Sequence, residues 1–532
     1  MIAKELTHNL LLLCFTLAFV AQCFIDPSIN NLACACIIYS STVACLLYLR
    51  WTRAVDSHPL SSMALLGFNV TSHSGAMLFQ SLALTSVSDN LRQPLITFSV
   101  LAAAQSGALI MHSVYRWWRQ GSVVARPKME RPSFLIRAGL HEVPSIRALW
   151  WIGVVGLLGL LMSKIGFLYQ LGNGLSFLVV APFLIPVFRS RVGPDYCSTR
   201  LNYTWLAVFA VAIGLVAIAA NTRAIMFKGG ITIALIMLLE LLRSRAEVTA
   251  RQIWMTAALA VLCWALSYPL SYLAEAMVVA RQDRLYSSKL EMLEKTVEVL
   301  MDPQKVQSVG KKRVQEARTG YDELYIENAL LARFSETKFH DNAMYFGAHM
   351  REDDIERLGE TTGGFLWAIL PQPVLNLFQV GVDKLDLRFS MGDFLAHSVV
   401  GHSLGGYATG SIFGQGIALF GAGFAIVYML LCPLLFLAID IFALKRNDGW
   451  GMASVPGLLA IWTTFQYGIT AESFHQMLGG VLRGVVQTIV IYLLVYKAAK
   501  FLGQKKVRYK PLNRFDLAST DVGGRQVTLR SE

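Results

Sequence analysis

Long apolar runs separated by short polar connections are the main pattern along this chain of 532 residues. A run of about 18 or more apolar residues with almost no charge is long enough to cross a lipid bilayer as a helix. The pattern predicts about twelve such spans. They fall near residues 9–24, 29–49, 60–86, 94–112, 149–163, 174–188, 203–220, 224–242, 253–279, 419–444, 452–471 and 483–497. We therefore expect an all-α, polytopic integral membrane protein.

Polar residues gather in one long interruption between the ninth and tenth predicted spans. From residue 281 to 394, acidic and basic side chains are interspersed, which is typical of a small helical unit outside the membrane. Two amphipathic helices are expected within it, at 281–300 and 322–339. The predicted organisation is spans one to nine at 1–280, a periplasmic helical cap at 281–394, a Gly-rich re-entrant segment with spans ten to twelve at 395–500, and a basic, disordered cytoplasmic tail at 501–532.

Composition and charge agree with a membrane protein and indicate its orientation. Hydrophobic residues make up 55% of the chain and charged residues 15%, and the net charge is +12. Short loops rich in Lys and Arg stay in the cytoplasm, and here the basic residues follow every second span. This alternation predicts that both termini are cytoplasmic, and it accounts for the positive charge without nucleic-acid binding. The basic residues after spans two, four and eight are Arg50, Arg53, Arg116, Arg119, Arg126, Lys128, Arg131, Arg137, Arg147, Arg243, Arg245 and Arg251.

Cysteines give no sign of a disulfide framework or a metal site. Five of the eight, Cys14, Cys23, Cys34, Cys36 and Cys45, lie in the first two predicted spans, and the long external segment has none. The chain has no Cys-x-x-Cys pair and no His-Glu-x-x-His motif, which are typical spacings of zinc ligands. We expect no bound metal and no cofactor.

The stretch Gly401-His402-Ser403-Leu404-Gly405-Gly406 matches the nucleophile turn G-x-S-x-G of α/β-hydrolases. That turn requires a preceding strand, and it requires an Asp and then a His later in the chain. Here His475 is the one histidine that follows, and Asp440 is expected on the opposite, cytoplasmic side. The sequence therefore disfavours a serine hydrolase and favours close helix packing and a re-entrant turn.

Basic residues near the external membrane surface form the first candidate site. Arg223 begins a predicted span, Lys228 lies about one turn inside it, Arg281 and Arg284 follow the ninth span, and Arg333 belongs to the cap. Guanidinium groups pair bidentately with phosphate oxygens, so this set could bind a diphosphate. The alternative for Arg281 and for Arg483, at the start of the last span, is that the side chain extends to the interface without binding a ligand.

Histidines cluster on the same side. His340 and His349 lie in the cap, His397 and His402 at its return to the membrane, and His475 on the last external turn. A neutral imidazole beside a hydroxyl can act as a general base near pH 7, although many loop histidines are simply solvated. We favour His402, which lies in the glycine turn, with His340 and His397 as secondary candidates.

Four segments resemble the bacterial O-antigen polymerase and ligase superfamily. NTRAIMFKGGITIAL resembles the start of its Arg-containing span, ENALLARFSE its Arg-containing loop helix, and ILPQPVLNLFQVGVDK its proline-led segment ending in Lys. HSLGGYATGSIFGQGIALFGAGFAI resembles the glycine run before the next span. The span count and the late external loop are also similar. The ligase branch usually has His-Asn where this chain has His402-Ser403.

The resemblance implies a GT-C-like glycosyltransferase, a Wzy-like polymerase of O-antigen or exopolysaccharide repeat units in the bacterial inner membrane. Its substrate would be a glycan on undecaprenyl diphosphate, with the active site in the periplasm. Arg223 and Arg284 would stabilise the leaving diphosphate with Lys228, Arg281 and Arg333 in support, and His402 would activate the acceptor hydroxyl. Membrane lipids, a chain-length regulator and a flippase are candidate partners. The alternatives are an O-antigen ligase that transfers glycan to lipid A core, and a lipid-linked oligosaccharide flippase or transporter.

Overall fold

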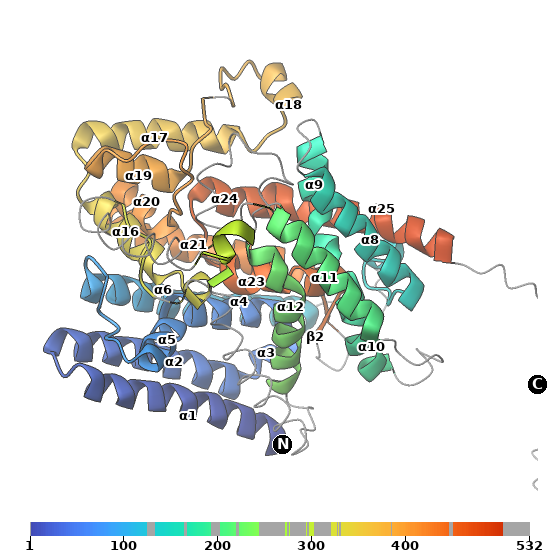
Figure 1. Ribbon diagram of the computed structural model, residues 1–532, viewed down its shortest axis with the longest axis horizontal. Helices are drawn as coiled ribbons and strands as arrows, with labels where there is room; N and C mark the ends of the chain where they lie inside the picture. Colours follow the sequence, from blue (N-terminus) through green and yellow to red (C-terminus); the bar gives the residue numbers. More distant parts are fainter. Residues whose placement is uncertain are drawn as a thin grey trace, which may run out of the picture.

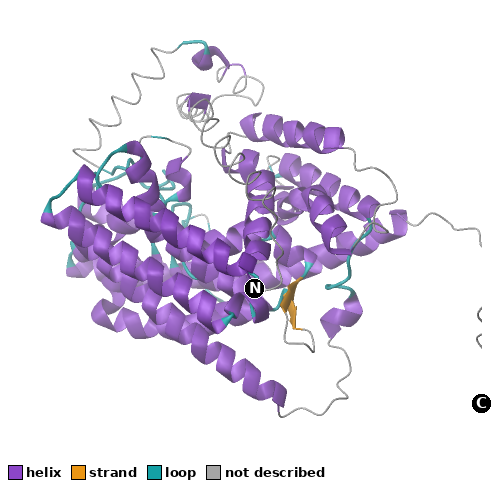
Figure 2. Cartoon of the chain, turned by 90° about the horizontal axis from the view of Figure 1, so that it is seen from below, coloured by secondary structure: helices purple, strands orange, loops and turns teal. Residues whose placement is uncertain are grey.

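The computed structural model is a mostly helical bundle, and its described residues contain one short β-hairpin (Figure 2). β1 (Ala443–Lys445) and β2 (Gly451–Ala453) pair antiparallel, with Leu444 opposite Met452. The predicted all-α class is therefore confirmed apart from this hairpin. The residues that the structure describes are 2–124, 134–163, 168–192, 203–219, 223–243, 272–273, 276, 294, 297–302, 321–326, 328, 331–384, 386–445 and 451–503.

The α-helices are α1 (Ile2–Ile25), α2 (Ile29–Thr52), α3 (Ala54–Ser57), α4 (Pro59–Asn69), α5 (Gly75–Ala83), α6 (Pro94–Val124), α7 (Phe134–Ala138), α8 (Ile146–Met162), α9 (Tyr169–Leu175), α10 (Ile185–Val192), α11 (Tyr203–Ala219), α12 (Arg223–Leu241), α16 (Thr337–Ala348), α17 (Glu352–Trp367), α18 (Gln372–Leu377), α19 (Met391–Val400), α20 (Ile412–Phe420), α21 (Phe424–Asp440), α22 (Val455–Leu459), α23 (Ile461–Tyr467), α24 (Phe474–Gly479) and α25 (Val485–Gly503). The π-helical turns are η1 (Val70–Ser74) and η8 (Gly480–Gly484), and the 3₁₀ segments are η3 (Ser176–Leu184), η6 (Leu331–Phe334) and η7 (Gly421–Gly423).

Six helical segments in the described part of the chain are long and apolar enough to cross a membrane, which supports a multi-pass membrane protein. They match the predicted spans near 9–24, 29–49, 94–112, 174–188, 419–444 and 483–497. Two further apolar helices, at Ile146–Met162 and Tyr203–Ile218, are shorter. The predicted span at 253–279 lies almost wholly outside the described residues, so the total of twelve stays a prediction. The six segments are Glu5–Ile25, Ile29–Thr52, Pro94–Arg119, Tyr169–Phe188, Ile412–Asp440 and Phe474–Leu502.

The predicted span at 60–86 is an interrupted helix in the middle of the bundle. α4, η1 and α5 follow one another, and α4 packs against α2, α6, α21 and α23 (Figure 1). Every residue from Pro59 to Asn69 is buried, although Ser61, Ser62 and Asn69 are polar. In Figure 1, α16, α17 and α19 lie at the upper left, α1 begins near the lower centre and α25 ends on the right. We call the end of the bundle covered by α16 to α19 the capped end, and the end where α1 begins and α21 ends the opposite end.

Two segments differ from the prediction. The expected span at 452–471 is β2 followed by the short helices α22 and α23, because Ser454 caps a new helix whose second residue is Pro456. The expected helix at 322–339 is non-helical at 321–326, and α16 begins only at Thr337. Tyr325 explains this difference, because its hydroxyl donates to the carbonyl of Val87 (2.8 Å) and its own carbonyl accepts from Gln80. These contacts hold the segment extended across α5.

The cap is the unit formed by α16 to α19, and its own apolar core includes Phe346, Leu358, Phe365 and Leu395. Asp341 joins the cap to the bundle at the start of α6. Its carboxylate accepts the backbone N–H of Arg92 (2.6 Å) and of Gln93 (3.0 Å) and the hydroxyl of Thr97 (2.8 Å). A carboxylate at a helix N-terminus satisfies free N–H groups and interacts favourably with the helix dipole.

α16 approaches α20 at backbone distance. A Cβ added to Gly414 would lie 2.3 Å from the carbonyl carbon of Ala343, and one added to Gly347 would lie 2.5 Å from the carbonyl oxygen of Gly414. Side chains at these positions would force the two helices apart. Close packing is thus found at Gly414, whereas the packing predicted for the GHSLGG glycines is not found: an added Cβ would meet no atom within 4 Å at Gly401 and none closer than 3.9 Å at Gly405.

Candidate functional site

The loop that contains GHSLGG is organised around a buried carboxylate. Asp393, on α19, accepts the backbone N–H groups of Gly405 (3.1 Å), Tyr407 (2.8 Å) and Ala408 (2.7 Å). It also accepts the N–H of Ser390, whose hydroxyl in turn accepts from the N–H of Asp393, so the two form a capping box. The carboxylate thereby gathers the loop into a compact turn.

GHSLGG is therefore a helix-terminating loop and not a nucleophile turn. Helix α19 precedes it, and Gly401 ends that helix with a φ of 69°. A nucleophile turn follows a strand and leads directly into a helix. Ser403 is exposed, and among the described residues no hydrogen bond joins its hydroxyl to a histidine. The structure gives the serine-hydrolase interpretation no support.

The ring of His402 lies between a carboxylate and an aromatic ring. His402 Nε2 is 4.0 Å from Asp393 Oδ1, and its ring centroid is 5.1 Å from that of Tyr321. The side chain is 28% exposed, so it can meet a ligand from outside. His397 is exposed and lies beside it, with Nδ1 2.7 Å from the carbonyl oxygen of His402. Both histidines, a primary and a secondary candidate, thus belong to one surface next to a carboxylate.

His340, the other secondary candidate, is not part of that surface. It is buried where the cap meets η1, with Nδ1 2.8 Å from Ser411 Oγ and Nε2 3.2 Å from Ser72 Oγ. Burial, together with the nearby His73, lowers its pKa to about 3. A neutral imidazole between two hydroxyls and closed off from solvent cannot meet a glycan hydroxyl directly.

The basic residues predicted to bind phosphate fall mostly outside the described part of the structure. Arg281 and Arg284 lie outside the described residues, and the side chains of Arg223 and Arg333 are not described either. The backbone of Arg223 begins α12, which packs against η3, α22 and α23. Lys228 lies on the same helix and is partly buried. The ring of phosphate-binding arginines therefore stays a prediction.

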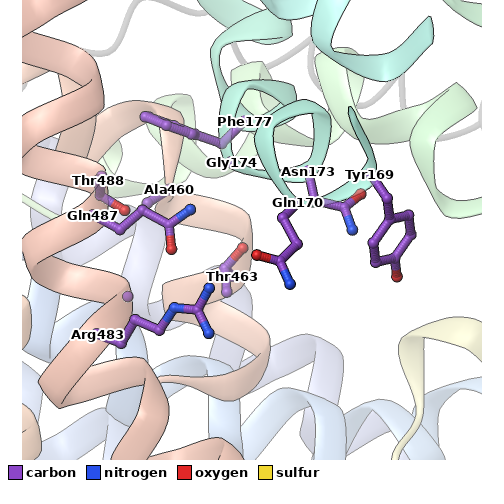
Figure 3. A pocket seen from close by; sticks show the side chains of 11 residues that line it. Tyr169, Gln170, Asn173, Gly174, Phe177, Ala460, Thr463, Arg483, Gln487 and Thr488 are labelled. Carbon is purple, nitrogen blue, oxygen red and sulfur yellow. The ribbon is translucent and has the colours of Figure 1, made fainter. Parts of the chain in front are cut away.

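A cavity of about 530 Å³ with both apolar and polar lining residues opens between α9, α23 and the junction of η8 with α25. Arg483 is its basic lining residue, and the side chain points into the cavity toward Thr463 and Gln170 (Figure 3). Asn173 and Gln487 add amide groups. Hydroxyls and amides around one guanidinium can surround an anion with hydrogen-bond donors.

A second cation lies close to Arg483. Lys384, in the cap segment after α18, donates to the carbonyl of Leu370 (2.6 Å). Burial and the positive charge of Arg483 lower the pKa of Lys384. Neither cation has a carboxylate partner among the described ion pairs. Two cations that repel each other and lack a counter-ion are typical of an anion-binding site.

The sequence contains only partial signals for this site. Arg483 is predicted near the membrane interface, and Lys384 is the final residue of the segment ILPQPVLNLFQVGVDK, which carries part of the family resemblance. Nothing in either segment indicates that the two meet. Asp393 was missed, although Ser390-Met391-Gly392-Asp393 has the capping-box spacing. Among the described residues, no hydrogen bond or ion pair links the Arg483 cavity to the His402 surface.

Comparison of the chain with protein-family models, with curated proteins and with solved structures finds no match. Function is therefore inferred from the chemistry of the two sites and from the sequence resemblance.

Proposed function

We propose that this chain is a membrane glycosyltransferase that polymerises oligosaccharide repeat units carried on undecaprenyl diphosphate. The observation that carries the proposal is a pair of cations: Arg483 lines a cavity among the apolar helices, and Lys384 of the cap segment lies close enough to Arg483 for the two charges to interact. A lipid diphosphate needs this combination, because its head group requires cations and its tail requires lipid. The proposed location is the bacterial inner membrane, with about twelve spans, a GT-C-like fold and a periplasmic active site.

The proposed reaction is a substitution at the anomeric carbon of the lipid-linked glycan. A hydroxyl of the acceptor repeat unit attacks this carbon, the bond to the diphosphate oxygen breaks, and the hydroxyl proton leaves to a base. Negative charge builds on the departing diphosphate, so Arg483 and Lys384 would stabilise the transition state more than the ground state. The phospho-sugar bond supplies the driving force, and the proposal requires no cofactor.

The residues inferred from the sequence complete the proposal. His402 would orient or deprotonate the acceptor hydroxyl, supported by its position beside Asp393 and its partial exposure. Arg223, Arg284 and Lys228 would add positive charge around the diphosphate. A chain-length regulator and a flippase would be its partners.

Variants of the two cations test the proposal. We expect Arg483→Ala to lower the polymerisation rate of purified protein in lipid vesicles by roughly 10²-fold, the usual cost of removing one charge-stabilising donor. Arg483→Lys should retain more activity, because it keeps the charge and loses the bidentate geometry. Arg357→Ala is the matched control, since Arg357 is a cap arginine that is 71% exposed. Equal rates for Arg483→Ala and the wild type would exclude the cavity as the diphosphate site.

A transporter or flippase of lipid-linked oligosaccharides is the second candidate. Interrupted helices are typical of transporters, and both the α4–η1–α5 and the α24–η8–α25 helices are interrupted by a π-helical turn. Transfer of a fluorescent lipid diphosphate between leaflets, without any change in its glycan, would favour this candidate over the polymerase. Glycan transfer to added lipid A core would instead favour the ligase.

A further inference from the structure

Buried polar side chains line one interface inside the bundle, between the α4–η1 stretch and α6. Ser62, Asn69 and His73 lie on the first and Gln105 on the second, and each is exposed by 1% or less. α4 packs against α2, α6 and α21, which belong to segments long and apolar enough to cross a membrane. Polar groups at this depth have no access to bulk water.

Many side-chain atoms of these four residues have no hydrogen-bond partner among the described residues. They are Ser62 Oγ, both side-chain amide atoms of Asn69, both ring nitrogens of His73, and Gln105 Oε1. The backbone carbonyls of Phe68 and Leu101 approach the His73 ring without reaching hydrogen-bond geometry. Each unpaired buried polar group destabilises the folded state, and more strongly where lipid surrounds the protein. Several such groups in one row point to water molecules that bond to them.

Polar groups recur at every turn of this interface. Ser61 and Ser62 lie on the first turn of α4. One turn later, the carbonyl of Leu65 accepts from the side chain of Gln105 (3.4 Å). Asn69 and His73 follow Leu65 at intervals of four residues. From Ser61 to His73 the helical rise covers about 18 Å, more than half of a hydrocarbon core of about 30 Å. The π-helical turn η1 begins directly after Asn69, and such turns are often found at functional sites.

The row ends in hydrogen-bonded ionisable groups toward the cap. Ser72, the neighbour of His73, contacts His340 Nε2, and the other ring nitrogen of His340 contacts Ser411. The backbone N–H of Glu336 donates to the carbonyl of Thr71 (2.8 Å). The Glu336 carboxylate also accepts from the side chains of Gln466 and Tyr467.

The opposite end holds a second such network. Asp440 accepts from the backbone N–H of Ser61 (3.2 Å), from the Ser61 hydroxyl (2.8 Å) and from the Tyr115 hydroxyl (3.2 Å). Ser61 Oγ also lies 3.0 Å from His112 Nε2, and His112 Nδ1 lies 2.8 Å from the hydroxyl of Tyr48. An acid, a hydroxyl and an imidazole are thus joined in one chain of hydrogen bonds.

The other ionisable groups around this end are His58 and two arginines. The ring of His58 lies 6.2 Å from that of His112 and 5.6 Å from that of Tyr115. Arg116 donates to the carbonyl of Thr52 (2.8 Å), and Arg119 lies near Asp440. The network therefore lies near the end of α2, which holds both Tyr48 and Thr52.

We propose that the interface between α4–η1 and α6 holds a chain of water molecules that relays protons between His340 at the capped end and Asp440 at the opposite end. We call the row formed by Ser62, Asn69, His73 and Gln105 the polar seam. The bound species are water molecules and the proton, because the side chains of the seam are neutral hydrogen-bond donors and acceptors. Both ends are closed by hydrogen-bonded side chains rather than open mouths, so slow, voltage-driven transfer is expected. The inference does not rest on the proposed glycosyltransferase function.

Water in the seam can be observed directly. With the protein in lipid bilayers and ¹⁵N label on Asn and Gln side chains, magnetisation transfer from water should reach the side-chain amides of Asn69 and Gln105. Assignment follows from loss of the respective signals in Asn69→Leu and Gln105→Leu. Absence of water transfer to both amides, with transfer to exposed Gln379 as the positive control, would overturn the proposal.

Proton relay needs a second measurement. Vesicles that contain a pH-sensitive dye, with and without the wild-type protein, are polarised with potassium and valinomycin. We expect the protein to increase proton entry, and Asn69→Leu and Gln105→Leu to return it to the rate of protein-free vesicles. Ser106→Ala is the matched control, since Ser106 neighbours Gln105 but is exposed and bonds within its own helix. No flux with the wild type, or unchanged flux in both leucine variants that still elute as folded protein, would overturn the relay.

Discussion

Replacement of Asp393 by Asn should open the GHSLGG loop without unfolding the protein. The carboxylate is fully buried and accepts four backbone N–H groups, from Ser390, Gly405, Tyr407 and Ala408. Asn offers a single acceptor oxygen. If that oxygen occupies the Oδ2 position, it keeps three of the four donors, and the amide NH₂ then faces the N–H of Ala408.

The expected cost follows from these bonds. The lost bond to a charged acceptor is worth about 2 kcal/mol. The three remaining bonds change from charged to neutral acceptors and weaken by about 0.5 kcal/mol each. The sum is about 3.5 kcal/mol, which corresponds to a fall of about 10²- to 10³-fold in the protection of the loop amides against hydrogen exchange.

Hydrogen–deuterium exchange of the peptide that covers residues 401–411 measures this change. The matched control is Ser403→Ala, in the same loop, which removes an exposed hydroxyl and should leave the protection unchanged. Far-UV circular dichroism should be the same for both variants. Equal exchange in Asp393→Asn and the wild type would refute the view that this carboxylate organises the loop. Loss of protection in Ser403→Ala would reopen a functional role for the serine.

Three further predictions concern other parts of the fold. His340 has a pKa of about 3 against an ordinary 6.5, so the folded state binds fewer protons and stability falls as the pH drops below about 6.5. Between pH 7 and pH 5 the free energy of unfolding should fall by about 2 kcal/mol. The melting temperature of His340→Gln in detergent should therefore depend less on pH than that of the wild type. Equal slopes of melting temperature against pH for the two proteins would contradict this prediction. Gly414→Ala should lower the melting temperature by several degrees, because the new methyl group meets the backbone of α16. The methyl group of Gly230→Ala meets no atom within 4 Å, so this variant should be neutral or stabilising. Similar melting temperatures for the two variants would contradict this prediction. Lys384→Ala should weaken binding of inorganic diphosphate to the purified protein, and unchanged affinity would remove it from the anion site.

The sequence predicted those elements whose signal is local. Runs of apolar residues identified α1, α2, α6 and α25, because the length of a membrane span is set by the bilayer and leaves a clear pattern. The same rule failed at 452–471, where the apolar composition is high but Ser454 and Pro456 start a new, short helix. Hydropathy measures burial, and it does not distinguish one spanning helix from two short buried ones.

The candidate sites depended on contacts that no local pattern contains. Arg483 and Lys384 are far apart in the chain, and the fold brings the cap segment over the last span. Asp440 is predicted on the cytoplasmic side, and no local pattern indicates that it accepts from Ser61 in the core. Short polar residues such as Ser61 and Asn69 barely lower the hydropathy of a run, so a polar interface inside the bundle leaves little trace in the sequence.

The most direct test of the central claim is polymerisation by the purified protein in vesicles supplied with repeat units on undecaprenyl diphosphate, without nucleotide sugar or metal. The products are separated on a gel. A ladder of lengthening lipid-linked chains, lost in Arg483→Ala and kept in Arg357→Ala, is the predicted result. Unchanged repeat units in the presence of folded, correctly inserted protein, with and without lipid A core as acceptor, would contradict the assignment as a glycosyltransferase.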